Sequence, residues 1–416
     1  MTVIAHKKTA LSSRLEATSI SIANEDKALA LGVLENTPLP TTRTEAWKYT
    51  RVARLGKIAF TNQEATISSI DKYNIDSSAP TLVFVNGHFS KELSSNDLPE
   101  GISWNLLSDM NAIPATKLKL ENEVFNSLNT AHLTGGVQLT IAANVIVGTP
   151  VQILHIIKGT EVISNFKVII DAGKSSQASV VQGYFSEDGE NKFCNVTSEI
   201  SLAENAVLSI DKVQYEDENS FHISTEEVSQ ERNSLFTINT STLNGGLVRN
   251  NLHIKVNGTN CNSVLNGVYL MKNKQHVDNH TIVDHIAAHC ESHELYKGVM
   301  DDKSTAVFNG KVFVRPDAQK INAFQSNGNV LLSDNATVNS KPELEIYADD
   351  VKCSHGSTTG QLDDEAIFYL RARGLSKRSA HQLMVSAFIG EVLDMIKNEN
   401  VRSYVDGLLT ERFGWE

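Results

Sequence analysis

Short runs of alternating apolar and polar residues, broken by Asn, Asp, Gly and Ser, fill the chain from Gly135 to about Val351. Such runs predict β-strands joined by tight turns. A motif of a polar or small residue, then Ala or Ser, then an apolar strand recurs there, with its Ala or Ser at positions 178, 206, 234, 263, 306 and 336. The steps are 28, 28, 29, 43 and 30 residues. We interpret the longest step as one repeat with an insertion of about half a repeat.

A repeat of nearly constant length favours stacked coils that bury a continuous apolar interior. A β-sandwich, the alternative, would place turns every ~8–12 residues without a longer period. The predicted fold is therefore mainly β, with a parallel β-helix core over residues 135–358. Because open strand edges invite pairing with other chains, the ends need cover. We expect it from a mostly helical region with one β segment (1–134) and a helical region (359–416).

The helical expectation for the N-terminal region rests on apolar residues at helix-like spacings: Leu11, Leu15, Ile20, Ala28, Leu31 and Leu34. Pro38 and Pro40 end that pattern. Thr81–Ser90 predicts a strand that enters an Asn-Gly turn. A further helix is predicted around Ala115–Leu133.

Helix signals return after Gly360. Asp363 or Asp364 can cap a first helix, and Gly374 can end it in a left-handed conformation. A second helix is predicted after Ser376, with one apolar face formed by Ala380, Leu383, Met384, Ala387, Phe388 and Leu393. The two helices form an αα-hairpin, and the tail from Val401 predicts one more helix.

Composition narrows the function classes. The 416 residues carry a net charge of −12 and no basic block, which argues against nucleic acid or an anionic membrane as partner. No apolar stretch approaches the ~20 residues of a membrane span, and the N-terminus lacks an export signal. The four cysteines are scattered without a CxxC pair. Together these features predict a cytoplasmic protein.

A histidine-rich run covers residues 275–293. His276, Asp278 and His280 alternate, so in a strand they share one face and could bind Zn²⁺ or iron. His289, Cys290 and His293 are further candidates. The alternative is the solvated face of a strand, where alternating polar residues are equally common.

Cys353 and His355 form a second candidate site. Two residues apart in a strand, their side chains point the same way. A thiolate and a neutral imidazole are good ligands for soft or borderline metals, including iron–sulfur clusters. One chain supplies two such ligands here, so a four-ligand site needs a partner. The alternative is a small cysteine and a turn histidine with structural roles only.

Enzyme signatures are weak. The segment from Ala172 to Ser175 resembles part of a phosphate-binding loop, but position 168 is Val where the motif requires Gly, so this chain is not expected to be an ATPase. A β-helix hydrolase or lyase acting on polysaccharide is an alternative, although aromatic residues make up only 6%. A third reading is a structural homodimer whose histidine-rich run binds zinc.

Five segments resemble the SufB/SufD family of iron–sulfur cluster assembly scaffolds. The most characteristic is KPELEIYADDVKCSHGSTTGQLDDEAIFYLRARGL at 341–375. RTEAWKYT (43–50) is similar to the N-terminal signature of the family. QHVDNHT, LYKGVM and AVFNGKV are similar to segments of its β-helix core. The likeness covers most of the chain after residue 40. It is greater to the SufD branch, because the chain lacks the clustered N-terminal cysteines of SufB.

The resemblance implies a right-handed parallel β-helix between helical units, and a non-enzymatic role. It implies a complex with a SufB-like paralogue and two copies of a SufC-like ABC ATPase, whose ATP-driven dimerisation exposes the shared interface. His355, with Cys353 as second candidate, would there hold a transient iron–sulfur cluster or iron. A reduced flavin would be the reductant, although no flavin motif stands in this chain. Without partners, a homodimer is the alternative.

The resemblance also implies where the ATPase docks. The expected surface is the C-terminal helical hairpin, around residues 365–396. The residues expected to carry docking are Glu365, Phe368, Tyr369, Arg371, Arg373, Leu383 and Phe388.

Overall fold

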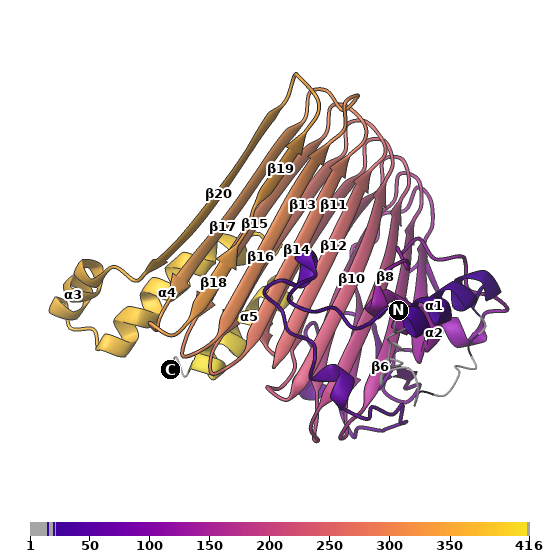
Figure 1. The fold of residues 1–416 in the computed structure, drawn as a ribbon, viewed down its shortest axis with the longest axis horizontal. Coiled ribbons are helices and arrows are strands. Elements are labelled where there is room, and N and C mark those ends of the chain that lie inside the picture. The colour runs from indigo at the N-terminus through magenta and orange to yellow at the C-terminus, as the bar shows by residue number, and fades with distance from the viewer. Residues whose placement is uncertain (1–14, 16–19, 21, 414–416) are drawn as a thin grey trace, which may run out of the picture.

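Two long sheets face each other and are linked coil by coil into a parallel β-helix (Figure 1). This computed structural model describes residues 15, 20 and 22–413. The first sheet contains, in spatial order, β2 (His88–Phe89), β1 (Thr81–Val85), β5 (Val151–Ile157), β7 (Gln177–Ser186), β9 (Val207–Tyr215), β11 (Leu235–Asn244), β13 (Asn262–Met271), β15 (Glu291–Met300), β17 (Asn322–Leu331) and β20 (Lys352–Gln361).

The second sheet contains β18 (Thr337–Ser340), β16 (Thr305–Val314), β14 (His276–His285), β12 (Leu247–Val256), β10 (Ser220–Gln230), β8 (Lys192–Leu202), β6 (Ile163–Ala172), β4 (Gly135–Ile141) and β3 (Ile102–Leu106), with β19 (Glu343–Ile346) also paired to β16. Apart from the antiparallel pairs β1–β2 and β3–β4, the ladders are parallel. The predicted fold class is confirmed.

The coils are more regular than the sequence repeat implied. Successive strands of the first sheet from β7 onward start 27 to 31 residues apart. Ser263 lies in β13 of the first sheet, whereas Ala306 lies in β16 of the second. The 43-residue step is therefore a change of sheet within regular coils, and its interpretation as an insertion is wrong.

One turn of each coil uses a left-handed residue. The positions with positive φ in equivalent turns are Ser175, Asn205, Asn233, Asn260, His289 and Lys320. Asparagine tolerates this conformation better than most residues. The amide of Asn233 donates to Asn205 Oδ1 at 2.9 Å, and that of Asn260 donates to Asn233 Oδ1 at 3.2 Å. These side-chain ladders tie neighbouring coils together.

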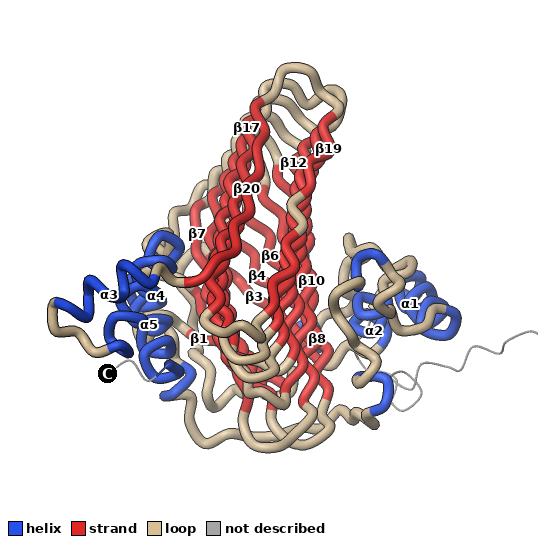
Figure 2. Tube along the Cα trace, turned by 60° about the vertical axis from the view of Figure 1, so that its left-hand side comes forward, coloured by secondary structure: helices blue, strands red, loops and turns tan. Residues whose placement is uncertain are grey.

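Helices cover opposite faces of the β-helix (Figure 2). α3 (Asp364–Ala372), α4 (Lys377–Leu393) and α5 (Glu399–Phe413) lie beside the first sheet, where α4 packs on β13 and β15. α1 (Asn24–Asn36) and α2 (Val124–Ala131) lie beside the second sheet, where α2 packs on β6 and β8. Strands such as β5 are therefore buried on both faces and read as continuous apolar runs.

The N-terminal region is less helical than predicted. Up to residue 134 its described part contains α1, α2 and four 3₁₀ turns: η1 (Glu45–Trp47), η2 (Leu55–Lys57), η3 (Asp71–Tyr73) and η4 (Leu107–Asp109). It also supplies three strands instead of one β segment. α1 ends before Pro38 as predicted, and Asn86 and Gly87 form the turn between β1 and β2. Of the earlier helix-like pattern, Leu11 lies outside the described residues.

The helix predicted from Ala115 begins only at Val124. The backbone N–H of Thr116 donates to an Asp26 carboxylate oxygen at 2.7 Å, and that of Lys117 donates to Glu199 at 2.9 Å. These side chains satisfy the backbone in an extended conformation, so a helix gains less there.

The C-terminal helices follow their sequence signals. Asp363 caps α3 by accepting from the Glu365 N–H, and Gly374 ends it with φ of +100°. β20 runs to Gln361, three residues beyond the expected boundary at 358. The predicted inner face of α4 is partly wrong: Val385, Ile389 and Val392 are buried there with Ala380 and Leu393, whereas Leu383 is 48% exposed. The helix is apolar on two sides, and only packing selects the buried one.

Candidate functional site at the open end of the β-helix

β20 is the last strand of the first sheet, and its far edge is free. It pairs with β17 in parallel along its whole length, and no strand in the described part of the chain pairs with its other edge. Every residue of β20 is exposed except Cys353, which is half-buried. The β-helix is thus open at this end, and an unpaired edge of ten residues is a template for another strand.

The register places Cys353 and His355 on the inward side of β20. Cys353 lies opposite Ala323 and His355 lies opposite Gln325, and both partners on β17 are buried. The expectation that the two side chains share one face is confirmed. They are exposed or half-buried only because no further coil covers them. The thiol and imidazole therefore line the open mouth of the interior.

Cys353 packs against the apolar interior. Its neighbours in that partly buried rim include Leu344 and Val351. Burial raises the pKa of the Cys353 thiol, although a backbone hydrogen bond from Ala323 acts in the opposite direction. A cation bound to sulfur would be needed to hold the thiolate.

Two polar residues behind His355 were missed in the sequence. Glu294, Gln325 and His355 occupy the same position in three successive coils, 31 and 30 residues apart. Gln325 Nε2 donates to Glu294 Oε2 at 2.9 Å. Burial raises the pKa of Glu294 to about 7, despite hydrogen bonds from Thr281 and Gln325. The spacing of one coil was the signal that could have found them.

The histidine-rich run is held by other partners. His276, Asp278 and His280 share the outward face of β14, as predicted. Arg249 Nη1 lies 2.6 Å from Asp278 Oδ2, and His280 Nε2 lies 3.0 Å from Oδ1. The hydroxyl of Thr50 donates to Asp278 at 2.5 Å. Because a buried guanidinium already neutralises Asp278, the metal reading has little support in this strand.

The other candidates of the run have separate roles. His289 occupies the left-handed turn, Cys290 is buried with Sγ 3.2 Å from Gly258 O, and His293 stacks on Phe324 at 5.6 Å. The segment at 43–50 packs as predicted: Trp47 is buried, with the Arg249 guanidinium 3.8 Å from its ring centroid.

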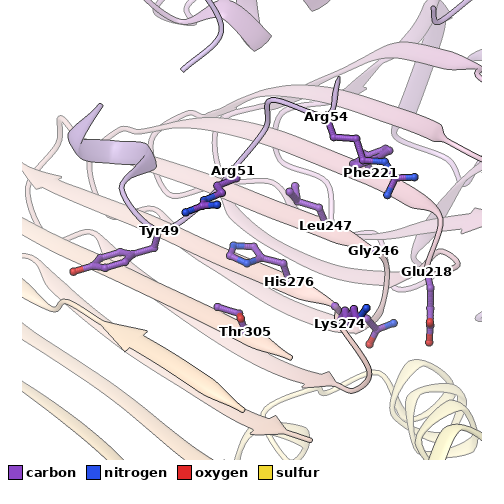
Figure 3. A pocket seen from close by; sticks show the side chains of 11 residues that line it. Tyr49, Arg51, Arg54, Glu218, Phe221, Gly246, Leu247, Lys274, His276 and Thr305 are labelled. Atoms are coloured by element: carbon purple, nitrogen blue, oxygen red, sulfur yellow. The ribbon is translucent and has the colours of Figure 1, made fainter. Parts of the chain in front are cut away.

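A surface cavity of about 400 Å³ lies over the second sheet (Figure 3). Tyr49, Arg51, Lys274 and His276 are among its lining residues. Neither Cys353 nor His355 contributes to its wall. The cavity is therefore separate from the open-end pair.

The expected docking residues are mostly exposed. Phe368 and Tyr369 on α3 are 73% and 56% exposed, and the Arg373 guanidinium lies 4.6 Å from the Tyr369 ring centroid. Glu365, Arg371 and Leu383 are also exposed. Phe388 differs: it packs inward, with Lys297 Nζ 4.7 Å from its ring centroid. Phe388 anchors α4 to the β-helix, so its assignment to the docking surface is dropped.

Comparisons with known proteins agree with this architecture. The SufBD core domain of SUF-system FeS cluster assembly matches residues 155–388, and the SufBD N-terminal region matches 9–153. A SufBD family protein of Synechocystis is 32% identical, over 91% of this chain and 88% of that protein. Iron–sulfur cluster assembly protein SufD of Escherichia coli is 30% identical, over 91% and 90%.

The described helices also bear on membranes: none of them is long and apolar enough to cross a bilayer. With family matches that together cover residues 9–388 and a fold in agreement, the chain belongs to the SufB/SufD family of iron–sulfur cluster assembly proteins, and within that family it is SufD-like.

Proposed function

We propose that this chain is the SufD-type subunit of a non-catalytic scaffold, that its β20 edge pairs with a SufB-like paralogue, and that Cys353 and His355 bind a nascent iron–sulfur cluster at that junction. The inward register of these two side chains on an unpaired terminal strand carries the proposal. Pairing along β20 would bring ligands of the second subunit to the same mouth. Without the paralogue, the same edge offers itself to a second copy of this chain.

Sharing the ligands suits a cluster that must be delivered. A thiolate and an imidazole from one chain leave positions to be filled by the partner. A cluster held across an interface is released when the interface opens, because each half alone supplies too few ligands. The cluster is cargo here, and the protein's contribution is to hold two ligands on a rigid strand backed by nine further strands of the first sheet.

His355→Ala in the assembled complex tests the ligand assignment. Losing a ligand should lower cluster formation in cells by at least about tenfold, while the subunits still copurify. Ser354→Ala is the matched control, since Ser354 is exposed on the opposite side of the same strand. Normal cluster yield in an intact His355→Ala complex would remove His355 from the site, and an equal loss in both variants would show a general effect on β20.

We further propose that a SufC-like ABC ATPase docks on the hairpin of α3 and α4. α3 packs on α4 and presents Phe368 and Tyr369 to solvent, and exposed aromatic pairs are typical anchors of protein interfaces. Glu365, Arg371, Arg373 and Leu383 would form the surrounding contacts.

The double variant Phe368→Ala/Tyr369→Ala should weaken ATPase binding by about 30-fold, measured by titration of the ATPase into the purified chain. Ile146→Ala is the control, because Ile146 is 78% exposed but lies in the turn before β5, outside the helical hairpin. Unchanged binding by the double variant would place the ATPase elsewhere. A reduced flavin as reductant of the complex stays a prediction.

A further inference from the structure

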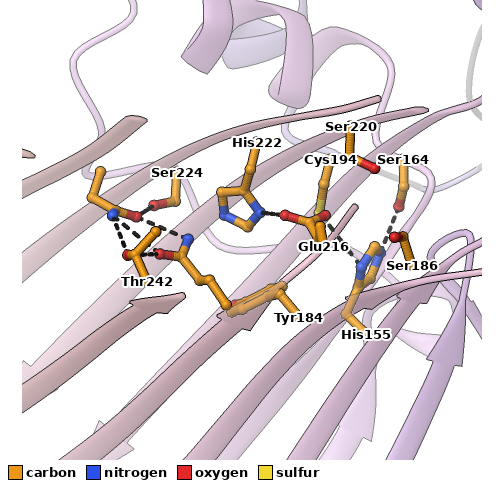
Figure 4. Close-up of polar contacts among 12 residues, drawn as sticks. His155, Ser164, Tyr184, Ser186, Cys194, Glu216, Ser220, His222, Ser224 and Thr242 are labelled. Atoms are coloured by element: carbon orange, nitrogen blue, oxygen red, sulfur yellow. Dashed lines mark hydrogen bonds and ion pairs between the residues drawn. The ribbon is translucent and has the colours of Figure 1, made fainter. Parts of the chain in front are cut away.

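Four chemically reactive side chains meet inside the β-helix, away from the open end. His155 on β5, Cys194 on β8, Glu216 after β9 and His222 on β10 all have 0% exposure. Figure 4 shows the Glu216 carboxylate between the His222 ring and Cys194, with His155 approaching from the facing sheet. None of these residues belongs to the site proposed above.

The backbone fixes this arrangement. Cys194 and His222 are register partners on the adjacent strands β8 and β10, so their side chains enter the interior side by side. Sγ of Cys194, a carboxylate oxygen of Glu216 and a ring nitrogen of His222 all lie within 4.8 Å of one another. His155 Nδ1 lies 3.4 Å from Cys194 Sγ.

These spacings suit ligands of one small cation. With Zn–S of ~2.3 Å and Zn–N of ~2.0–2.1 Å, the sulfur and nitrogen ligands of a tetrahedral zinc ion lie about 3.5 Å apart. The His155–Cys194 distance is close to that value. Glu216 Oε2 and His222 Nδ1 are 2.8 Å apart, a hydrogen-bond distance, and would separate by about 0.5 Å on binding the same ion.

Unsatisfied polar atoms point to a missing partner. Within the described part of the chain, Glu216 Oε1 and His222 Nε2 are buried without a hydrogen bond. An unpaired buried carboxylate oxygen is costly in an apolar interior. A metal ion bound to the carboxylate would remove that cost.

The orientation of His155 is already set. Its Nε2 lies 2.8 Å from Ser164 Oγ, and donation of Nε2–H to this hydroxyl leaves the Nδ1 lone pair directed at the cysteine. Metal-binding histidines are commonly oriented through their other ring nitrogen in this way. Ser164 would thus be a positioning residue for the site.

We propose that His155, Cys194, Glu216 and His222 form a buried tetrahedral site for a divalent transition-metal ion, with Zn²⁺ the ion that this ligand set fits best. Binding would release the thiol proton and the proton shared by Glu216 and His222. One thiolate and one carboxylate would then balance the two charges of the ion, beside two neutral imidazoles. Lys212, farther along the interior, is already paired with Glu226.

Because all four side chains are enclosed, the ion would enter during folding and then be retained. The full-length chain should therefore be produced in cells, dialysed against EDTA and analysed for metals by mass spectrometry. We expect about one equivalent of zinc per chain. Growth with Co²⁺ should give a protein with the thiolate-to-cobalt absorption and intense visible bands of a tetrahedral site.

Cys194→Ser and Glu216→Gln should each lower the zinc content and abolish the cobalt spectrum. Glu216→Gln preserves side-chain shape, so it decides the question if Cys194→Ser fails to fold, as judged by circular dichroism. Cys290→Ser is the matched control, because this buried cysteine lies on a distant coil and its loss should leave zinc unchanged.

Three results would overturn the proposal. One is folded wild-type protein with less than about 0.1 equivalent of metal, far below the stoichiometry of a structural site. Another is zinc retained at full content in both Cys194→Ser and Glu216→Gln. The third is zinc lost from Cys353→Ser but kept in the two interior variants, which would assign the ion to the open-end pair.

Discussion

Replacing Arg249 by methionine is expected to lower the free energy of unfolding by about 3–5 kcal/mol, because it leaves the Asp278 carboxylate buried without its countercharge. The Arg249 and Asp278 side chains are 3% and 1% exposed. Burial alone would raise the pKa of Asp278, yet Arg249, with His280 and Thr50, holds it well below its usual range. Arg249 also donates to Ala46 O at 2.8 Å and covers Trp47.

Arg249 therefore couples two structural levels. Its loss should destabilise the second sheet and also loosen the N-terminal segment at 43–50, visible as faster amide exchange of that segment. Urea unfolding followed by circular dichroism measures the stability. Adding Asp278→Asn to Arg249→Met should restore part of the loss, since no charge then stays buried alone.

Arg315→Met is the matched control on the same sheet. Arg315 forms two hydrogen bonds with Asp284, at 2.9 and 2.8 Å, but its side chain is 48% exposed. An exposed ion pair is worth about 1 kcal/mol or less. Similar losses from Arg249→Met and Arg315→Met would contradict the view that burial makes the first pair important.

Glu294→Gln is expected to stabilise the protein at pH 8 by about 2–3 kcal/mol and to have little effect at pH 5. The pKa of Glu294 is about 7 in the folded chain, raised by burial from a usual value of 4.5. Between these values the folded state keeps a proton that the unfolded state loses. Stability of the wild type should therefore fall as pH rises from about 4.5 to 7 and then level off.

Glutamine removes this titration and can still accept from Gln325. Unfolding in urea at pH 5 and pH 8 gives the difference directly. Glu291→Gln is the control on the same strand, because the Glu291 side chain is 49% exposed and its replacement should give the same small effect at both pH values. A pH-independent effect of Glu294→Gln would show that the buried carboxyl is not protonated in the folded protein.

The sequence was a good guide wherever the chain repeats itself or ends a helix. Coils of 27 to 31 residues leave a period in the sequence, because each coil places small and apolar residues at the same points of the same two sheets. Asp363, Gly374 and Ser376 act through their own backbone neighbours, so their roles could be predicted locally. The period could not say which sheet a motif belonged to, and the 43-residue step was misread for that reason.

Contacts between distant segments decided the rest. The alternation of Cys353 and His355 determined that they share a face, but only the absence of a further coil over β20 exposes that face. Leu383 and Val385 look equally apolar in the sequence, and packing on the first sheet buries one of them. In the same way, Cys194 is a solitary thiol in the sequence. Parallel pairing and the closeness of the facing sheet bring it to His222, Glu216 and His155, because side-chain neighbours in a β-helix lie one coil or half a coil apart.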